Sequence, residues 1–228
     1  MTLTLYDLAM ADIDVRPSPY CWLAKFGLLH KGLAFETVPL RFAEKQNYPD
    51  PDHARLPILK DGEEIICDSA NILAHLDKRY PGKPIVATSA EQAAADFYTA
   101  WMGAHLFPAL APMLMLPIWQ GVHEDDKEYF RTMREARFGK PLEELAATPG
   151  LKEKAEAAMK TLAAPLSRFD YLGGDAPNLC DYTVFGVFMW RDLATSEALF
   201  ETPAPVDAWR ERMLDQFDGY ARNALKAA

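Results

Sequence analysis

The chain has 228 residues, half of them hydrophobic and a quarter charged, which is ordinary for a soluble protein of one large domain or two small ones. Its net charge of −9 disfavours DNA, RNA or an acidic membrane surface as the main partner. Three widely spaced cysteines, Cys21, Cys67 and Cys180, indicate neither a disulfide framework nor a metal site, and they are typical of a reducing compartment. Residues 1–7 have no basic region and no long apolar run, so we expect no signal peptide and a cytoplasmic location.

The first elements are a strand and a helix. Residues 2–6 alternate polar and apolar side chains, as a half-buried strand does. Ser18 as N-cap and Pro19 at the first helical position then predict a helix that ends at the His-Lys-Gly run 30–32. The Ser18 hydroxyl is expected at the positive end of the helix dipole, beside backbone N–H groups that have no helical partner. A dithiol oxidoreductase would carry cysteine here, so Ser-Pro-Tyr-Cys at 18–21 favours a site that binds the thiolate of another molecule.

The following segments predict the rest of a small mixed sheet. In chain order we expect a strand over 33–40, a loop of weak helical potential over 41–55, strands over 57–60 and 64–67, and a helix over 68–80. Asp61-Gly62 between the last two strands is a strong hairpin signal. The order β-α-β, loop, β-β-α predicts a thioredoxin-like α/β domain over residues 1–80, with a four-stranded mixed sheet.

The rest of the chain is helical in pattern. Residues 81–90 are rich in Pro, Gly, Thr and Ser and predict a linker, so residues 91–228 form an all-α domain. Its expected helices cover 91–119, 123–137, 151–169, 178–195 and 206–225. Asn178 lies three residues before Asp181, which predicts a capping box at the start of the fourth helix. We prefer this interpretation of Asp181 to a catalytic acid.

The first of these helices contains a long stretch without charge. Residues 102–119 approach the length of a membrane span, but they include His105 and three prolines. A bent helix inside a soluble helical domain is therefore preferred to a transmembrane helix. Such a helix suits the wall of an apolar pocket and equally suits a plain core, and the sequence leaves both interpretations open.

Taken in order, these motifs resemble those of glutathione transferases over nearly the whole chain. The matching features are Ser-Pro-Tyr-Cys at 18–21, Arg55-Leu56-Pro57, Asp68-Ser69 and the capping box at Asn178 and Asp181. Other segments are similar to the β-aryl etherase branch of that family and its etherase-like relatives in fungi, namely 4–8, Trp22, 30–32, 77–81, 176–190 and 217–219. The resemblance implies a thioredoxin-like domain followed by an all-α domain, glutathione as co-substrate and, as is usual in the family, a homodimer.

The resemblance also implies roles for individual residues. Ser18 would donate a hydrogen bond to the glutathione sulfur. A cis Leu56–Pro57 bond would expose the Leu56 backbone to the cysteinyl unit, Asp68-Ser69 would hold the γ-glutamyl end, and Arg55 would meet the glycyl carboxylate. The structural alternatives are plain N-caps for Ser18 and Asp68-Ser69 and a solvated loop side chain for Arg55.

The implied reaction is attack of the bound thiolate on an electrophilic carbon of an apolar, aromatic substrate, with cleavage of an aryl ether as one form of it. The expected walls of the hydrophobic pocket are large aromatic side chains, namely Trp22, Trp101, Phe107 and Trp119. Cys21 is interpreted as a small buried side chain; its alternative is an active thiol, which would make the protein a glutathione-dependent thiol transferase. A non-catalytic carrier of hydrophobic ligands is a further alternative. We expect no metal, no nucleic-acid partner and no membrane.

Overall fold

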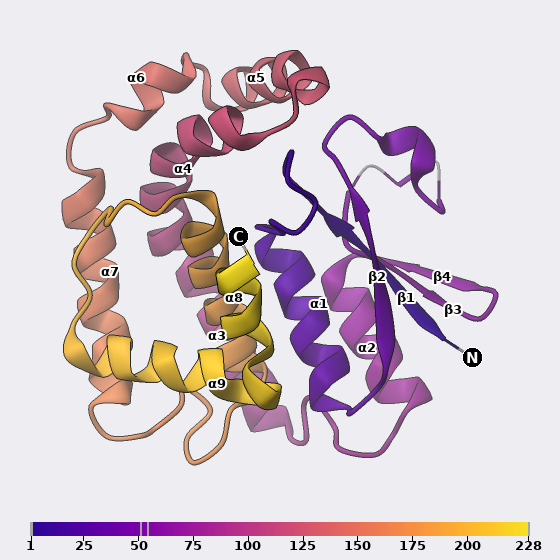
Figure 1. The fold of residues 1–228 in the computed structure, drawn as a ribbon. Coiled ribbons are helices and arrows are strands. Elements are labelled where there is room, and N and C mark those ends of the chain that lie inside the picture. The colour runs from indigo at the N-terminus through magenta and orange to yellow at the C-terminus, as the bar shows by residue number, and fades with distance from the viewer. Residues whose placement is uncertain (1, 51, 54, 228) are drawn as a thin grey trace.

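The computed structural model describes residues 2–50, 52–53 and 55–227 (Figure 1). Its N-terminal elements are β1 (Leu3–Leu8), α1 (Pro19–His30), β2 (Phe35–Leu40), the 3-10 turn η1 (Lys45–Asn47), β3 (Ile58–Asp61), β4 (Glu64–Cys67) and α2 (Ser69–Arg79). The sheet order is β2-β1-β3-β4, with β1 parallel to β2 and antiparallel to β3. A crossover helix followed by a hairpin produces this order, and it confirms the predicted thioredoxin-like fold.

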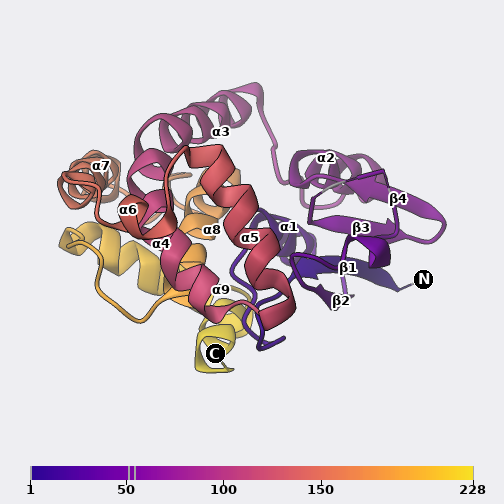
Figure 2. The same ribbon diagram turned by 90° about the horizontal axis from the view of Figure 1, so that it is seen from above.

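Side chains of β1 alternate between the two faces of this sheet. Leu3 and Leu5 are buried in a core with Leu28 of α1 and Ile72 of α2, so both helices cover that face. Tyr6 points the other way and packs against a smaller cluster of Leu40, Tyr48 and Ile58. Figures 1 and 2 show α1 and α2 on the side of the sheet that faces the rest of the chain. The sheet therefore supports α1 from one side only, which leaves its other side to the helical domain.

The rest of the chain is an all-helical domain. Its elements are α3 (Ser89–Trp101), the π-helical turn η2 (Met102–Leu106), α4 (Phe107–Gly121), α5 (Glu124–Phe138), α6 (Leu142–Ala146), α7 (Leu151–Leu166), α8 (Leu179–Ala194) and α9 (Ala204–Ala227). The five predicted helical regions are present, and the short helix α6 was not predicted. Five residues are too few for a periodic apolar pattern, so the sequence offers no signal for α6.

The predicted helix over 91–119 is interrupted by η2. Phe107 N–H donates to the Met102 carbonyl five residues earlier, and Pro108 follows directly. Because proline has no N–H, it cannot bond the carbonyl of Ala104, and the turn before it widens. The whole segment Ser89–Gly121 is long and apolar enough to cross a membrane, but 56% of its most apolar window is buried inside the protein. Such burial is typical of a core helix.

Helix α8 lies at the centre of this domain, and it begins with the predicted capping box. The Asp181 carboxylate accepts N–H groups from Leu172 (2.7 Å), Gly173 (2.9 Å) and Asn178 (3.1 Å), and from the Trp209 indole (2.8 Å). Its oxygens are thus occupied by structural donors, as the capping role requires.

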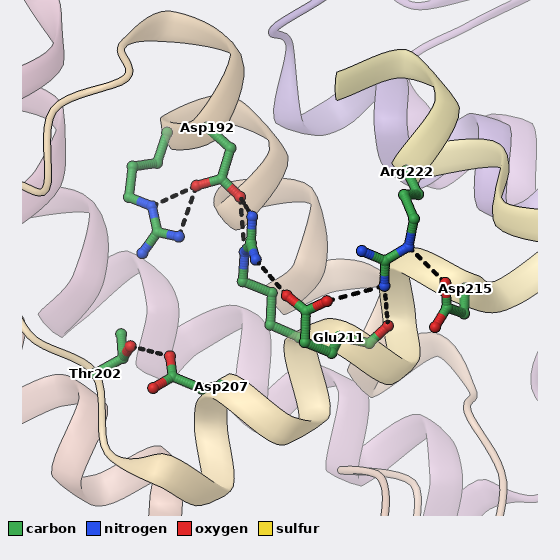
Figure 3. A network of polar contacts seen from close by, with 8 residues as sticks. Asp192, Thr202, Asp207, Glu211, Asp215 and Arg222 are labelled. Carbon is green, nitrogen blue, oxygen red and sulfur yellow. Dashed lines mark hydrogen bonds and ion pairs between the residues drawn. The ribbon is translucent and has the colours of Figure 1, made fainter. Parts of the chain in front are cut away.

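Helix α9 bends back on itself near its end. Phe217 and Asp218 adopt left-handed backbone angles, with φ of 53° and 58°, and the last helical turns return to lie beside α1 (Figure 1). Figure 3 shows how Arg222 bridges this bend: its guanidinium donates to Glu211 Oε2 (2.9 Å) and Asp215 Oδ1 (2.6 Å). The turns of α9 that follow the bend are therefore held against the earlier part of the same helix and against the N-terminal domain.

Candidate functional site

Ser18 lies where the loop after β1 enters α1. Its backbone is extended (φ −60°, ψ 120°), and its Oγ accepts the Cys21 N–H at 3.3 Å. The residue is only 6% exposed. Since Oγ acts as the acceptor in this cap, the hydroxyl hydrogen is not used by it and can be donated to a ligand. Ser18 is therefore an N-cap with a donor to spare at the positive end of a helix.

Cys21 lies one turn further along α1 and is fully buried. Burial raises the pKa of its thiol well above the ordinary range, and the nearby carboxylate of Asp7 raises it further. A buried, protonated thiol is a poor nucleophile, because the thiolate is the reactive form. This environment agrees with the interpretation of Cys21 as a small buried side chain and disfavours an active thiol.

The turn before β3 lies next to the start of α2. The Leu56–Pro57 bond is cis, and the Pro57 carbonyl accepts the Asp68 N–H at 3.2 Å. Asp68 is the exposed N-cap of α2 with φ of 76°, and Ser69 behind it is buried. A non-glycine residue in the left-handed region is uncommon and tends to mark turns and ligand clamps. The cis bond that the family resemblance implies and the predicted capped helix start are both present, and the structure brings them into contact.

The loop before this turn holds a residue that sequence reasoning missed. Arg55 is exposed, whereas the Nε2 atom of nearby His53 is buried, and no residue in the described part of the chain gives it a hydrogen-bond partner. A buried polar atom without a partner is a candidate ligand contact. A single histidine in an irregular loop carries no periodic or capping signal, so only the structure identifies it.

The helical domain meets the N-terminal domain around Ser18. Tyr20 and Phe107 of α4 stack with ring centroids 6.3 Å apart. A Cβ at Gly186 of α8 would lie 2.5 Å from the Pro19 carbonyl oxygen, so only glycine allows this approach. Further along the edge, the Ala43 N–H donates to Asp126 Oδ1 of α5 at 2.9 Å. The first residues of α1, directly after Ser18, are thus in contact with α4 and α8.

The four aromatic residues expected in the pocket lie in different surroundings. Trp22 and Trp101 are buried in the core, with 1% and 7% exposure, while Phe107 and Trp119 are half-buried. Phe107 contacts the Ser18 turn through Tyr20. Trp119 lies under the cations of α5, with Lys127 Nζ 4.7 Å from its ring. Phe107 is accordingly the best placed of the four to face a molecule bound at Ser18.

One open hollow of about 340 Å³ lies against α5. Its lining residues are Asp125, Glu128, Tyr129, Thr132 and Met133. Lys45 of η1 lies 5.2 Å from the Tyr129 ring, so the hollow borders the N-terminal domain. The substrate pocket expected along residues 91–119 stays a prediction. Over the residues that the structure describes, no three His, Cys, Asp or Glu side chains gather in a way that could hold a metal ion.

Comparison with known proteins identifies two matching family models. The model for the glutathione S-transferase N-terminal domain matches residues 13–84, and the model for the C-terminal domain matches residues 93–220. Glutathione S-transferase U22 of Arabidopsis thaliana is 25% identical over 200 residues, which are 84% of this chain and 79% of that protein.

Solved structures of glutathione transferases are also similar to this chain. The glutathione S-transferase CsGST63524 of Ceriporiopsis subvermispora, solved in complex with glutathione, is 25% identical, with a TM-score of 0.76 over 96% of this chain and 98% of that chain. Glutathione transferase GSTFuA3 of Phanerochaete chrysosporium is 20% identical, with a TM-score of 0.75 over 100% of this chain and 96% of that chain. At 20% identity, the similarity to GSTFuA3 shows a shared fold only.

Proposed function

The chain belongs to the glutathione S-transferase family, and from this premise we propose that Ser18 activates the thiol of bound glutathione for attack on an electrophilic carbon. The observation that carries the proposal is the Ser18 N-cap at the positive end of α1, where the cap uses Oγ only as an acceptor and the hydroxyl can donate to a thiol nearby, as it does toward the Cys21 thiol. A free thiol has a pKa near 8.5, and a fall of about two units leaves it mostly ionised at neutral pH.

In this proposal glutathione lies along the turn before β3 and the start of α2. The Leu56 backbone pairs with the cysteinyl unit, while the Asp68 carboxylate takes the ammonium of the γ-glutamyl end. Ser69, as the first residue of α2, adds the helix N-terminus for the α-carboxylate. For the glycyl carboxylate we propose Arg55, with the buried Nε2 of His53, which has no hydrogen-bond partner among the described residues, as a second contact.

The proposed electrophile is apolar and aromatic. The Tyr20–Phe107 stack places aromatic surface directly after the Ser18 turn, and ring surface suits a flat aromatic substrate. Displacement of a phenolate from an aryl ether is one such reaction: sulfur forms a bond to carbon as the carbon–oxygen bond breaks, and the oxygen leaves with the electron pair. The resemblance of the sequence to etherases supports this form of the reaction.

The test is turnover of Ser18→Ala with saturating glutathione and an activated aromatic electrophile. Loss of a hydrogen bond to a charged acceptor is worth about 1.5–3 kcal/mol, so turnover should fall by about one to two powers of ten. Thr88→Ala is the matched control, because the Thr88 hydroxyl caps α3 in the same way, with Oγ1 accepting the Glu91 N–H at 3.2 Å. Both variants lose a cap, and only Ser18→Ala should lose activity. Wild-type turnover in Ser18→Ala would contradict the assignment.

We also propose that the protein is a cytoplasmic homodimer. Each domain exposes a large apolar side chain: Ile65 on the edge strand β4 and Phe97 on α3, with exposures of 37% and 63%. Phe97 is the most exposed of the large apolar side chains in the described part of the chain, and the proposal places it on the contact surface. The scarcity of cysteine supports the reducing location.

A further inference from the structure

A buried group of charges lies beneath the Ser18 turn. Asp7, near the end of β1, is fully buried, and its Oδ2 lies 2.5 Å from Lys25 Nζ in α1 and 3.4 Å from Arg16 Nη1. Lys25 is 3% exposed and also lies 4.4 Å from the centre of the Trp22 ring. Charges are rarely buried this deeply unless they are paired, because the desolvation of each is costly. Asp7 therefore connects a strand, a helix and the loop between them.

Arg16 is held from two sides within this group. Its guanidinium reaches Asp7 and the Ile13 carbonyl, and its own carbonyl accepts the Trp22 indole N–H at 2.7 Å. Arg16 is followed by Pro17, whose ring restricts the backbone, and then by Ser18. Because Pro17 is stiff, the position of Arg16 constrains the position of the Ser18 hydroxyl, which caps α1.

We infer that Asp7 is a positioning residue for Ser18 and acts through Arg16. The inference rests on the proposed function, because it concerns the placement of the hydroxyl that binds the glutathione thiolate. An error of about 1 Å in such a placement is enough to weaken a catalytic hydrogen bond strongly. Neither Asp7 nor Arg16 has to contact glutathione for this role.

Loss of the Asp7 charge can change the pKa of a bound thiol in two ways. The cations beside Asp7 are Lys25 and Arg16. The neutral groups near Asp7 are the Cys21 thiol and the Tyr220 phenol of the last turns of α9. Burial and the Asp7 carboxylate raise the pKa of Tyr220 to about 12. Removing only the negative charge would make the surroundings more positive and would lower the pKa of a bound thiol. Loosening Ser18 would remove a hydrogen bond to the thiolate and would raise that pKa. The two effects have opposite signs.

The experiment compares Asp7→Asn with Asp77→Asn in the full chain, with glutathione as ligand. Asp77 makes a similar pair, with Oδ1 2.5 Å from the buried Lys31 Nζ, at the opposite end of α1. Absorbance titration of the bound thiolate gives its pKa, and steady-state kinetics give kcat and KM. In Asp7→Asn we expect the thiol pKa to rise by about one unit, which lowers the ionised fraction and therefore kcat at about pH 7 by about threefold, with KM for glutathione little changed. In Asp77→Asn we expect a lower unfolding midpoint and an unchanged thiol pKa.

An unchanged or lower thiol pKa in Asp7→Asn would overturn the inference. If Asp7→Asn does not fold, Arg16→Met tests the same link, because it releases the loop and leaves the Asp7–Lys25 pair intact. A normal kcat and thiol pKa in Arg16→Met would likewise overturn it. Failure of the proposed function has a separate signature: wild-type protein would then show no thiolate signal with glutathione, whereas failure of the inference alone leaves the wild-type signal intact.

Discussion

Asp68 combines two roles that one substitution can separate. It caps α2 through Oδ1, which accepts the Ala70 N–H at 3.5 Å, and it presents an exposed carboxylate from a left-handed backbone position. Asparagine is an equally good cap and tolerates the same backbone angles, but it carries no charge. We expect Asp68→Asn to change the free energy of unfolding by less than about 0.5 kcal/mol and to raise KM for glutathione by about 10- to 100-fold. An unchanged KM would remove Asp68 from the proposed binding site.

His30 provides a pH-dependent tie between three segments. Its Nδ1 lies 2.8 Å from Tyr182 Oη in α8, and its Nε2 lies 3.1 Å from the Pro84 carbonyl oxygen. Burial lowers the pKa of His30 below its usual 6.5, so the unfolded chain binds the proton more tightly than the folded one. The stability that neutral His30 contributes is therefore complete above about pH 6.5 and is lost as the pH falls below it.

Urea unfolding at about pH 7.5 and 5.5 checks this. We expect the free energy of unfolding to fall more on acidification in the wild type than in His30→Gln. His105→Gln, at an exposed histidine of η2, is the matched control. Equal losses in wild type and His30→Gln would contradict the prediction.

At the scale of whole elements, α8 approaches the start of α1 closely across the domain boundary. Because a Cβ at Gly186 would meet the Pro19 carbonyl oxygen, Gly186→Ala must push α8 away from the Ser18 turn. We expect a loss of about 1–3 kcal/mol in the free energy of unfolding and lower turnover. Gly103→Ala is the control, since nothing lies within 4 Å of its added Cβ, and it should be neutral or slightly stabilising. Thermal unfolding and turnover measurements on both variants test this prediction.

For the whole molecule, the homodimer predicts a specific sensitivity to charge. Phe97→Glu places a carboxylate on the proposed contact surface and should convert a dimer to monomers, as measured by light scattering after size-exclusion chromatography. Phe169→Glu is the matched control, because Phe169 is an exposed phenylalanine (45%) that follows α7. A wild-type monomer at micromolar concentration, or equal effects of both substitutions, would contradict the proposal.

Features that depend on neighbours a few residues apart could be predicted from the sequence. The Ser18 and Asp68 caps, the hairpin at Gly62 and the box at Asn178 each follow from one backbone group bonding another nearby, so their signals are local. Their order along the chain also determined the thioredoxin-like topology, because few topologies satisfy a β-α-β unit followed by a hairpin.

What each of these features contacts could not be predicted, because it depends on how distant segments pack. The burial of Trp22, the pairing of Asp7 with Lys25 and the contact of Gly186 with Pro19 depend on residues that are remote in sequence. The buried Nε2 of His53, which has no partner among the described residues, lies in an irregular loop. The same holds for the bend in α9, where non-glycine residues adopt left-handed angles that packing and ion pairs must stabilise. Such contacts arise from the summed packing of distant segments, which no local pattern of residues encodes.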